Sequence, residues 1–276
     1  MPHIAATGVP AGPPGPMTAE YEVLSIDGDA FGARLVRVCR EERIHLWVNG
    51  ALVATLAISP HELAEFGCGY CITEGIVQGI HAVQEVKVSL PDIRVKATAV
   101  IEDALSRGTE ILTSGCKGVI PGPLYPEDHV PPGIVVPQPV IFSAMERLND
   151  HAVLWRSTGG THCTVIYDAA GNAVSQAEDV GRHNSVDKAI GKALLSGVDL
   201  GQTFLACSGR MPEGMVRKIY RAGIRLIVTN NAPSAAGIDL ARQVGLTLAG
   251  FVRPPRMNIY SRPERIALEV DGSRII

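Results

Sequence analysis

A run of alternating strand-like and helix-like segments between residues 203 and 253 constrains the fold more than any other part of the sequence. Three apolar stretches, TFLACS, IRLIVT and LTLAGFV, alternate with two helix-like segments, PEGMVRKIYRAG and SAAGIDLARQVG. Pro212 stands at the start of the first helix-like segment and Gly223 follows its end, which are typical positions for these residues. Strands joined by crossover helices form a parallel sheet with right-handed connections. The sequence therefore predicts an α/β domain over residues 140–276.

The segments before this run predict how the α/β domain begins. Residues 143–157 have a helical pattern, and CTVIYD with AVSQAED predicts a β-hairpin around residues 170–172. Asn184 and Asp187 mark the start of a further helix. Its apolar face is made by Val186, Ala189, Ile190, Ala193 and Leu194.

The N-terminal part, residues 21–139, has mainly strand-like patterns. Residues 34–58 alternate as three strands do, and Asn49-Gly50 supplies a type I′ turn between the second and the third. This pattern predicts an antiparallel meander. More β-like sequence follows at residues 83–101. We therefore expect a mainly antiparallel β-rich part, with one helix, in front of the α/β domain.

A capped helix and a disordered tail complete this half of the chain. Ser59 is predicted as the N-cap, Pro60 as the first helical residue, and Glu62 as the residue that closes a capping box. Residues 1–20 are rich in Pro, Gly and Ala and lack the features of a secretory signal peptide, which predicts a disordered tail. No apolar run is long enough to span a bilayer, so we expect no membrane partner.

Composition and cysteine usage exclude some classes of partner. The net charge is -3, and basic and acidic residues are interspersed, so the chain lacks the basic excess that nucleic-acid binding uses. Six cysteines are scattered over 276 residues without the spacing of a disulfide framework, which indicates free thiols in a reducing compartment. We therefore expect a cytoplasmic protein that does not bind nucleic acid.

The carboxyl ends of the predicted parallel strands indicate a ligand site. Ligands of open α/β sheets collect at this edge, where loops and helix N-termini offer free N–H groups. The loops there carry the donor side chains Ser208, Arg210, Asn230, Asn231, Ser234, Arg253 and Arg256. Such a set suits phosphate or a purine with several acceptors, which predicts a nucleotide ligand. The alternative is that these residues form ordinary turns and the arginines are solvated.

A second polar cluster, EDVGRHNSVDK, is predicted to lie near STGGTHC. It would bring Glu178, Asp179 and His183 close to His162, which suggests a metal site. The zinc deaminase pattern requires H-x-E and a later P-C-x-x-C, and neither is present, so we expect no resident metal. The alternative is that Asp179 and Arg182 brace the loop while each histidine makes an internal hydrogen bond. The sequence leaves the roles of both histidines open.

Among the cysteines, Cys116 is the best candidate nucleophile. It lies between glycines in TSGCKGVIPG, next to Lys117, whose charge lowers a thiol pKa, and the proline-rich sequence after it predicts an exposed loop. An incidental loop cysteine is the alternative. Cys68 and Cys71 form C-G-Y-C inside the predicted helix, where core packing is the better interpretation than a redox or metal pair. The same interpretation applies to the cysteines in predicted strands, which are Cys39, Cys163 and Cys207.

Several stretches together resemble the formate dehydrogenase accessory sulfurtransferase family, FdhD. They are VNG, SPHELAEFGCGYCITEGIV, STGGTHC, EDVGRHNSVDKAIGK, SGRMPEGMVRKIYRAGI, NNAPSAAGIDLARQVGLTLAGFVR and NIYS. The resemblance implies a cytidine-deaminase-like α/β domain and a homodimer. It also implies sulfurtransferase activity: Cys116 accepts persulfide sulfur from a cysteine desulfurase. The sulfur then passes to the molybdenum bis(molybdopterin guanine dinucleotide) cofactor before the cofactor enters formate dehydrogenase.

The resemblance also assigns residues to the cofactor. The family's cofactor-binding stretch corresponds to FVRPPR, which comprises Phe251, Val252, Arg253, Pro254, Pro255 and Arg256. Arg210 and Asn231 are expected to join the two arginines of this stretch in binding the guanine nucleotide and its phosphates. One departure concerns the sulfur-transfer loop, in which many members carry C-x-x-C but Val119 replaces the second cysteine here.

Two rival functions stay open. One is a non-catalytic molybdenum cofactor chaperone that has lost sulfur transfer together with the second cysteine. The other is a metal-dependent hydrolase of a nucleotide base, which the missing zinc motif disfavours. The sequence identifies neither the client enzyme nor the choice between molybdenum and tungsten.

Overall fold

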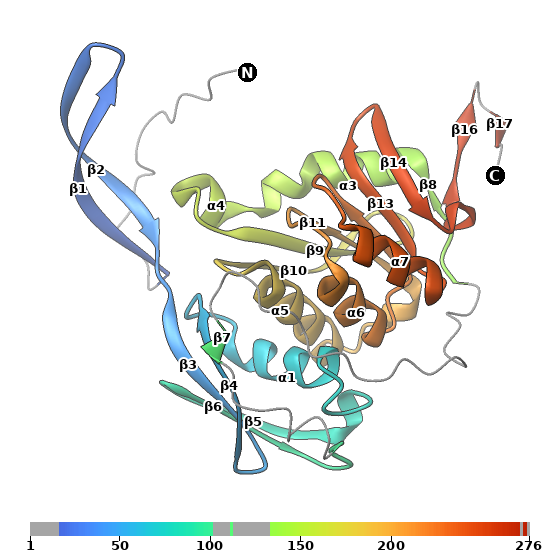
Figure 1. The fold of residues 1–276 in the computed structure, drawn as a ribbon, viewed down its shortest axis with the longest axis horizontal. Helices are drawn as coiled ribbons and strands as arrows, with labels where there is room; N and C mark the ends of the chain where they lie inside the picture. The colour runs from blue at the N-terminus through green and yellow to red at the C-terminus, as the bar shows by residue number, and fades with distance from the viewer. Residues whose placement is uncertain (1–16, 102–110, 113–132, 271–272, 275–276) are drawn as a thin grey trace.

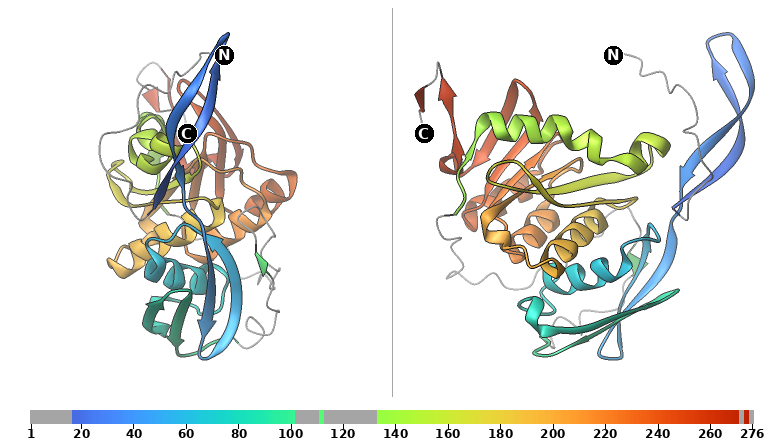
Figure 2. Two further views of the ribbon diagram at one scale, coloured as in Figure 1. Left: turned by 90° about the vertical axis from the view of Figure 1, so that its left-hand side faces the viewer. Right: turned by 180° about the vertical axis from the view of Figure 1, so that it is seen from behind.

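The structure, a computed structural model, describes residues 17–101, 111–112, 133–270 and 273–274. Cys116, the proline-rich sequence after it and most of the predicted tail lie outside these ranges. The two larger β-sheets have helices between and around them, and a separate hairpin projects from the body (Figures 1 and 2). No described helix is long and apolar enough to cross a membrane.

A six-stranded sheet forms the centre of the C-terminal part, in the order β10-β9-β11-β12-β13-β14. Its strands are β9 (His162–Asp168), β10 (Ala173–Asp179), β11 (Thr203–Cys207), β12 (Leu226–Thr229), β13 (Thr247–Arg253) and β14 (Arg256–Ser261). As the alternating pattern predicts, β11, β12 and β13 pair in parallel. The predicted hairpin of β9 and β10 is also confirmed. The pairs β9–β11 and β13–β14 are antiparallel, so the sheet is mixed.

Helices cover both faces of this sheet (Figure 1). One face packs against α3 (Gln138–His151). The predicted helix is divided at Ala152, and α4 (Val153–Thr158) begins after it. The other face packs against α5 (Arg182–Leu195), α6 (Glu213–Arg221) and α7 (Ala235–Gln243). Alternate strand residues point to opposite faces, so that Phe204 joins one core cluster and Leu205 the other. The shorter elements are η1 (Ile80–Ala82), η2 (Leu200–Gln202), η3 (Pro263–Arg265), β8 (Val136–Pro137), β15 (Ile266–Ala267), β16 (Glu269–Val270) and β17 (Ser273–Arg274).

A second sheet, in the order β5-β6-β3-β4-β7, forms the N-terminal part and packs against α1 (Leu63–Thr73). Its strands are β3 (Glu42–Val48), β4 (Ala51–Ile58), β5 (Val83–Ser89), β6 (Asp92–Ala97) and β7 (Ile111–Leu112). Asn49 and Gly50 have φ angles of 48° and 87°, which confirms the type I′ turn between β3 and β4. The predicted three-stranded meander is wrong, because the other neighbour of β3 is β6, in parallel. Strand β4 likewise pairs in parallel with β7.

The remaining strands, β1 (Thr18–Asp27) and β2 (Ala30–Cys39), pair only with each other and form a hairpin that we call the arm. The arm stands away from the body in Figure 1 and in the right view of Figure 2. Leu24, Ile26, Phe31 and Leu35 point to the same side of this hairpin and are 68%, 73%, 78% and 53% exposed. A two-stranded hairpin is marginally stable in water, and this one adds a large apolar surface to the protein exterior.

The predicted capping box at the start of α1 is wrong. The helix begins at Leu63, and Glu62 has a left-handed backbone with a φ angle of 51°. The Glu62 carboxylate pairs with Lys192 of α5 at 2.6 Å instead of capping its own helix. Ser59 is likewise engaged elsewhere, since its N–H donates to Asp179 and its hydroxyl accepts from Val180 N. Tertiary partners more than 100 residues away therefore override a local capping signal.

The contact between α1 and α5, which we call the seam, joins the two parts of the protein. Gly69 and Gly191 let the helix backbones approach closely: an added Cβ would lie 1.8 Å from Asp187 O at Gly69, and 1.9 Å from Glu65 O at Gly191. No side chain fits at either position. Close backbone packing of this kind requires glycine on both helices.

A buried charged group, which we call the Asp187 cluster, lies beside the seam. It consists of Asp187 on α5, Lys218 on α6, and Glu74 and Thr73 at the end of α1. The Lys218 ammonium lies 2.8 Å from Asp187 and 2.6 Å from Glu74, and the Thr73 hydroxyl donates to Asp187 at 2.6 Å. Lys218 and Asp187 are almost fully buried. Charges buried so deeply are tolerated because they neutralise each other and are hydrogen-bonded.

Candidate functional site

The edge of the large sheet where β10, β11, β12 and β13 end is the candidate functional site. The pairing directions bring the carboxyl ends of these strands to one edge, together with the start of β9. Helices α5, α6 and α7 also begin there, and the Ser234 hydroxyl caps α7 by accepting a hydrogen bond from Gly237 N. Helix N-termini present free N–H groups and partial positive charge, so this edge favours an anionic ligand.

Backbone hydrogen bonds join the loops after β11 and β12 to each other, and the loop after β12 to the end of β13. Met211 N donates to Ala232 O at 3.1 Å, and Phe251 N donates to Asn231 O at 3.0 Å. Three of the predicted cofactor-binding residues are therefore close neighbours, because Asn231 bonds to Phe251 and Arg210 precedes Met211. These segments therefore lie together at the carboxyl ends of the strands, as the strand topology predicts.

The predicted cofactor stretch forms the end of β13 and the turn into β14. Phe251 is 45% exposed and has a φ angle of 52°, which a bulky residue rarely adopts. The Val252 side chain is buried in the core, so only its backbone can meet a ligand. Arg253 and Arg256 are exposed and pair across the turn at residues 254–255. Like charges placed opposite each other repel, so this pair favours an anion between its guanidinium groups.

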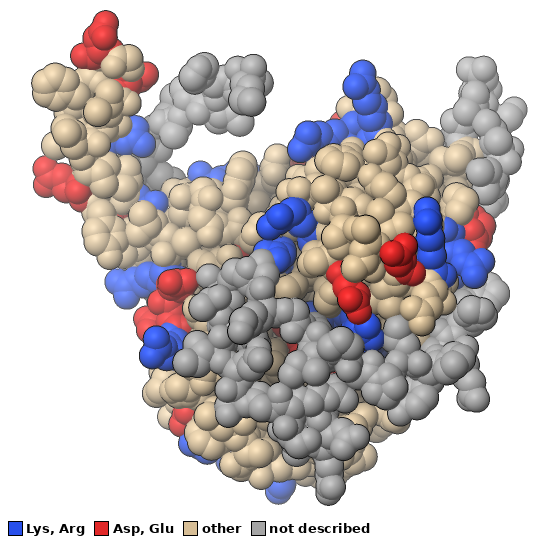
Figure 3. Space-filling model, in the orientation of Figure 1, with Lys and Arg blue, Asp and Glu red and all other residues tan. Residues whose placement is uncertain are grey.

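Charge is distributed unevenly over the exposed tips of the molecule. Figure 3 shows positive charge at the tip of the β13–β14 hairpin and negative charge at the tip of the arm. Exposed Arg253 and Arg256 supply the former, and exposed Asp27 and Asp29 the latter. The candidate site thus extends into a positively charged projection.

The two histidines of the candidate site differ in their hydrogen bonding. The Nδ1 atom of half-buried His162 lies 3.4 Å from the Ser208 hydroxyl, which confirms the expected internal contact for this residue. The Nε2 atom of His183 is buried and makes no hydrogen bond within the described structure, so the same expectation is wrong there. Burial lowers the pKa of His162, and it lowers the pKa of His183 to about 3. A neutral, buried ring nitrogen without a partner is a candidate ligand contact.

Arg182, in the first turn of α5, packs across the loop that follows β11. A Cβ added to Gly209 would lie 3.0 Å from the Arg182 Cβ atom, so this close approach leaves little room for a side chain. The positive charge of Arg182 also contributes to the lowered pKa of His162. Arg182 therefore contributes to the electrostatics of the site as well as to its packing.

The carboxylates of EDVGRHNSVDK serve internal structure. Glu178 accepts hydrogen bonds from Leu154 N at 2.6 Å and Trp155 N at 2.7 Å, and so caps the start of α4. Asp179 is fully buried and lies 2.6 Å from the Lys188 ammonium, which agrees with the bracing role that was one alternative for this loop. Among the residues that the structure describes, no group of three or more His, Cys, Asp or Glu side chains is arranged to hold a metal ion.

Most of the described cysteines are unsuited to nucleophilic chemistry. Burial raises the pKa of Cys68 to about 12 and that of Cys207 to about 11, and it raises those of Cys71 and Cys163 as well. Their predicted role in core packing is confirmed, because all four are buried. Cys39 is half-buried; its thiol donates to Gly160 O at 3.4 Å, and burial raises its pKa too. Cys116 lies outside the described residues, and its role stays a prediction.

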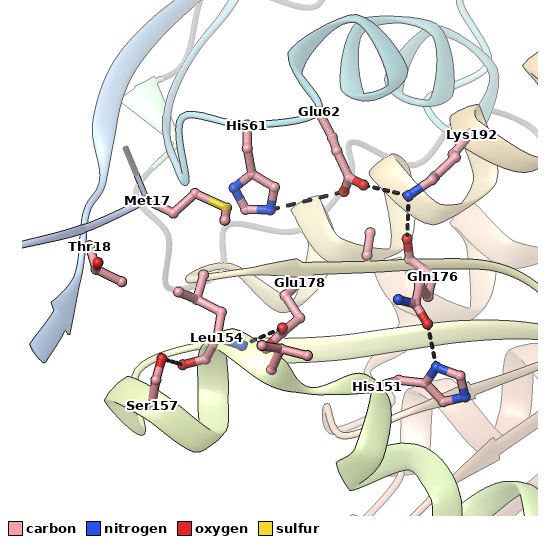
Figure 4. A pocket seen from close by; sticks show the side chains of 12 residues that line it. Met17, Thr18, His61, Glu62, His151, Leu154, Ser157, Gln176, Glu178 and Lys192 are labelled. Atoms are coloured by element: carbon pink, nitrogen blue, oxygen red, sulfur yellow. Dashed lines mark hydrogen bonds and ion pairs between the residues drawn. The ribbon is translucent and has the colours of Figure 1, made fainter. Parts of the chain in front are cut away.

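A pocket of about 300 Å³ lies where the root of the arm meets the body (Figure 4). Its wall combines the start of β1, the residues before α1, α4, β10 and Lys192 of α5. The Nδ1 atom of His61 is buried there and has no hydrogen-bond partner among the described residues, and burial lowers the pKa of this histidine to about 4. No sequence pattern indicates this pocket, because its residues come from five separate segments that no shared motif connects.

Comparisons with known proteins place the chain in a family. The model of the FdhD/NarQ family matches residues 39–267. A protein named sulfur carrier protein FdhD from Methanothermobacter thermautotrophicus is 36% identical over 230 residues, which cover 83% of this chain and 91% of the relative. A relative of the same name from Anaeromyxobacter dehalogenans is 32% identical over 283 residues, covering 94% of this chain and 96% of its own.

A solved structure agrees with this assignment. The crystal structure of a protein described as a formate dehydrogenase accessory protein, from Desulfotalea psychrophila, superimposes with a TM-score of 0.74. It is 26% identical in sequence, and the match covers 91% of this chain and all of the other. The family match spans both sheets, the seam and the candidate site, so the chain belongs to the FdhD/NarQ family.

Proposed function

We propose that the protein is a sulfurtransferase that carries sulfur as a persulfide on Cys116. In this proposal a cysteine desulfurase supplies the sulfur, and the molybdenum bis(molybdopterin guanine dinucleotide) cofactor of formate dehydrogenase, or its tungsten counterpart, receives it. The names of the relatives support sulfur carriage in general. The observation that carries the assignment to Cys116 is the state of the other thiols, because burial raises the pKa of each of them.

The loading step is a thiol exchange that needs no added oxidant or reductant. The Cys116 thiolate attacks the outer sulfur of the desulfurase persulfide, and a new S–S bond forms as the old one breaks. The bonding electron pair leaves with the desulfurase cysteine, which becomes a thiolate. The product is a persulfide on Cys116. In the delivery step its S–S bond would break, Cys116 would leave as a thiolate with the bonding pair, and the outer sulfur would become a sulfide ligand by taking two electrons from an acceptor metal in its reduced +4 state. A single cysteine suffices because no intramolecular disulfide takes part.

The candidate site supports binding of the guanine nucleotide ends of the cofactor. Arg210 and Asn231 lie in its joined loops, and the exposed Phe251 offers a ring on which a base can stack. Arg253 and Arg256 at the hairpin tip suit the phosphates. The kinship of this part with deaminases belongs to the same proposal and is supported by the mixed sheet with helices on both faces.

A homodimer is also part of the proposal, and the arm supports it. Its apolar face is too exposed for a stable surface in water, and a second copy of the chain presents the same self-complementary face. Two such faces packed together would remove each other's apolar side chains from water.

Intact-mass spectrometry after incubation with a cysteine desulfurase and cysteine tests the proposal. We expect one added sulfur atom on the parent protein and none on Cys116→Ser. Sulfur that persists on the variant would move the chemistry to another thiol, of which the half-buried Cys39 is the most accessible described one. A parent protein that takes up no sulfur would favour the non-catalytic cofactor chaperone, for which the missing second loop cysteine is the supporting observation.

A further inference from the structure

Asp179, at the end of β10, holds together residues from both parts of the protein. Its carboxylate is fully buried and accepts four hydrogen bonds. The donors are Ser59 N at 3.0 Å, Gly181 N at 2.8 Å, Asn184 Nδ2 at 2.9 Å and Lys188 Nζ at 2.6 Å. We call these five residues the Asp179 cluster. Both carboxylate oxygens are fully used, two donors each, so the geometry of the surrounding backbone is fixed.

One side of the Asp179 cluster is the turn that begins α5 at the candidate site. Gly181 and Asn184 flank Arg182 and His183, the two site residues that this turn carries. A Cβ on Gly181 would lie 2.8 Å from Asn184 Nδ2, so the amide packs directly on the turn. The cluster therefore sets where these two side chains lie at the ligand edge.

The other side of the Asp179 cluster is the end of β4. Ser59 follows β4 closely, and its hydroxyl accepts from Val180 N at 3.1 Å while its carbonyl accepts from Lys188 at 2.9 Å. Asn184 Nδ2 also donates to Ala57 O, within β4, at 3.0 Å. The strand is thus tied to the ligand edge by main-chain and side-chain bonds at two successive points.

Strand β4 in turn pairs with the strand that precedes Cys116. Thr55 pairs with Ile111 and Leu56 with Leu112, in parallel. Cys116 follows Leu112 by four residues, which span at most about 14 Å when fully extended. A continuous set of backbone and side-chain contacts therefore connects the turn at the ligand edge to the root of the Cys116 segment.

We infer that Asp179 and Asn184 are positioning residues that fix the root of the Cys116 segment relative to the ligand edge. The inference rests on the proposed function, since it concerns where the persulfide cysteine meets its acceptor. A nucleotide bound at the ligand edge then changes the reactivity of the Cys116 thiol, and β4 transmits this effect. The Asp187 cluster holds the same two parts together with equal burial, but it attaches to α1 and not to β4. It provides the matched control.

Thiol alkylation tests the inference, with guanosine diphosphate as the probe ligand. The rate at which N-ethylmaleimide modifies Cys116 is followed by peptide mass spectrometry, with and without saturating nucleotide. We expect nucleotide to change the rate in the parent protein by at least about five-fold, the lower end of typical coupling between sites. We expect less than about a two-fold change in Asn184→Ala and the full change in the control Thr73→Val, which instead removes the hydroxyl that donates to Asp187 in the Asp187 cluster.

A gentler variant covers the case in which Asn184→Ala does not fold. Ser59→Ala removes only the hydroxyl that accepts from Val180 N, and we expect it to reduce the nucleotide effect as well. A nucleotide effect that is absent from the parent protein, or that survives in both variants as fully as in Thr73→Val, would overturn the inference. Sulfur loading of Cys116, measured on the same parent preparation, reports on the proposed function separately. If Cys116 loads sulfur but nucleotide does not change its alkylation rate, the sulfur-carrier proposal stands and the inference is refuted.

Discussion

The seam and the arm distribute polarity in opposite ways. In the seam, glycines and the charges of the Asp187 cluster are buried between three helices. In the arm, Phe31 and Ile26 are mostly exposed although each is a large apolar residue. Soluble proteins usually show the reverse arrangement, with apolar side chains inside and charges in water.

The buried charges of the Asp187 cluster are paired within one chain, whereas the exposed apolar side chains of the arm are not covered by it. Every charge in the Asp187 cluster has an opposite charge within hydrogen-bond distance, so the seam is complete within one chain. The apolar face of the arm has no cover among the described residues of its own chain, as its exposure shows. Substitutions in the seam should therefore change the free energy of unfolding, and substitutions in the arm should change the association of two chains.

The largest effect is expected from filling the seam. Gly69→Ala places a Cβ 1.8 Å from Asp187 O, and neither helix backbone can move away without separating the two parts. We expect a loss of more than about 5 kcal/mol in the free energy of unfolding, beyond the about 1–3 kcal/mol of ordinary overpacking, because the clash is with backbone atoms. Urea denaturation measures it. The matched control is Gly32→Ala in the arm, where an added Cβ meets nothing within 4 Å, and a comparable loss there would contradict the argument.

Removal of the cation from the Asp187 cluster should have the next largest effect. Lys218→Met leaves Asp187 and Glu74 buried together without a positive partner. Breaking a buried ion pair in this way typically costs about 3–5 kcal/mol. Urea denaturation at pH 7.5 checks the value. Adding Asp187→Asn to Lys218→Met should restore part of the loss, and a double variant as unstable as the single one would show that charge is not the cause.

Much of the fold follows from local signals in the sequence. The parallel run of β11 to β13 was predictable because Pro212 and Gly223 mark the ends of a helix between apolar strands. The turn at Asn49-Gly50 was predictable because both residues favour positive φ. The start of α1 was not predictable, because the signal at Ser59 is overridden by Asp179, 120 residues away. The pairing of β3 with β6 was not predictable either, because it joins strands that are far apart in the sequence and no local pattern indicates it.

The candidate site was predictable where topology determines it. The joining of Asn231 to Phe251 follows from the rule that parallel strands end at one edge. The His183 Nε2 atom is buried without a partner in the part of the chain that the structure describes, and this depends on packing between segments that no local pattern indicates. The same applies to the pocket beside His61, which five separate segments build. The assignment of Cys116 rests on its sequence context and on the burial of other thiols.

The free energy of unfolding should depend on pH through Asp187. Burial raises its pKa to about 6, and the neighbouring Glu74 adds to the rise, whereas an aspartate in an unfolded chain has a pKa of about 3.9. Between these values the folded protein keeps a proton that the unfolded chain releases, so this group's stabilising contribution is present at low pH and is lost as pH rises to about 6. The amide that replaces the carboxyl in Asp187→Asn has no such proton.

The measurement compares the parent protein with Asp187→Asn between pH 4 and 7. The stability of the parent relative to the variant should fall over this range by on the order of 3 kcal/mol, at about 1.4 kcal/mol per pKa unit. Because the difference between the two proteins is used, titration of other groups cancels to first order. Two stability curves that run parallel over this range would show that the Asp187 cluster does not titrate there.

The arm should show the smallest effect on folding and a clear effect on association. Phe31→Ser alters a side chain that is 78% exposed, so we expect the free energy of unfolding of a single chain to change by less than about 0.5 kcal/mol. Light scattering after gel filtration should instead show the dimer dissociating to monomer. Val88→Ser, at another exposed apolar position that is 42% exposed on β5, should leave the dimer intact. A parent protein that is monomeric at micromolar concentration would refute the homodimer, and equal dissociation in both variants would show that the arm is not its specific contact. If only Phe31→Ser dissociates the dimer, the apolar face of the arm forms the dimer interface, because covering it requires the same face of a second chain.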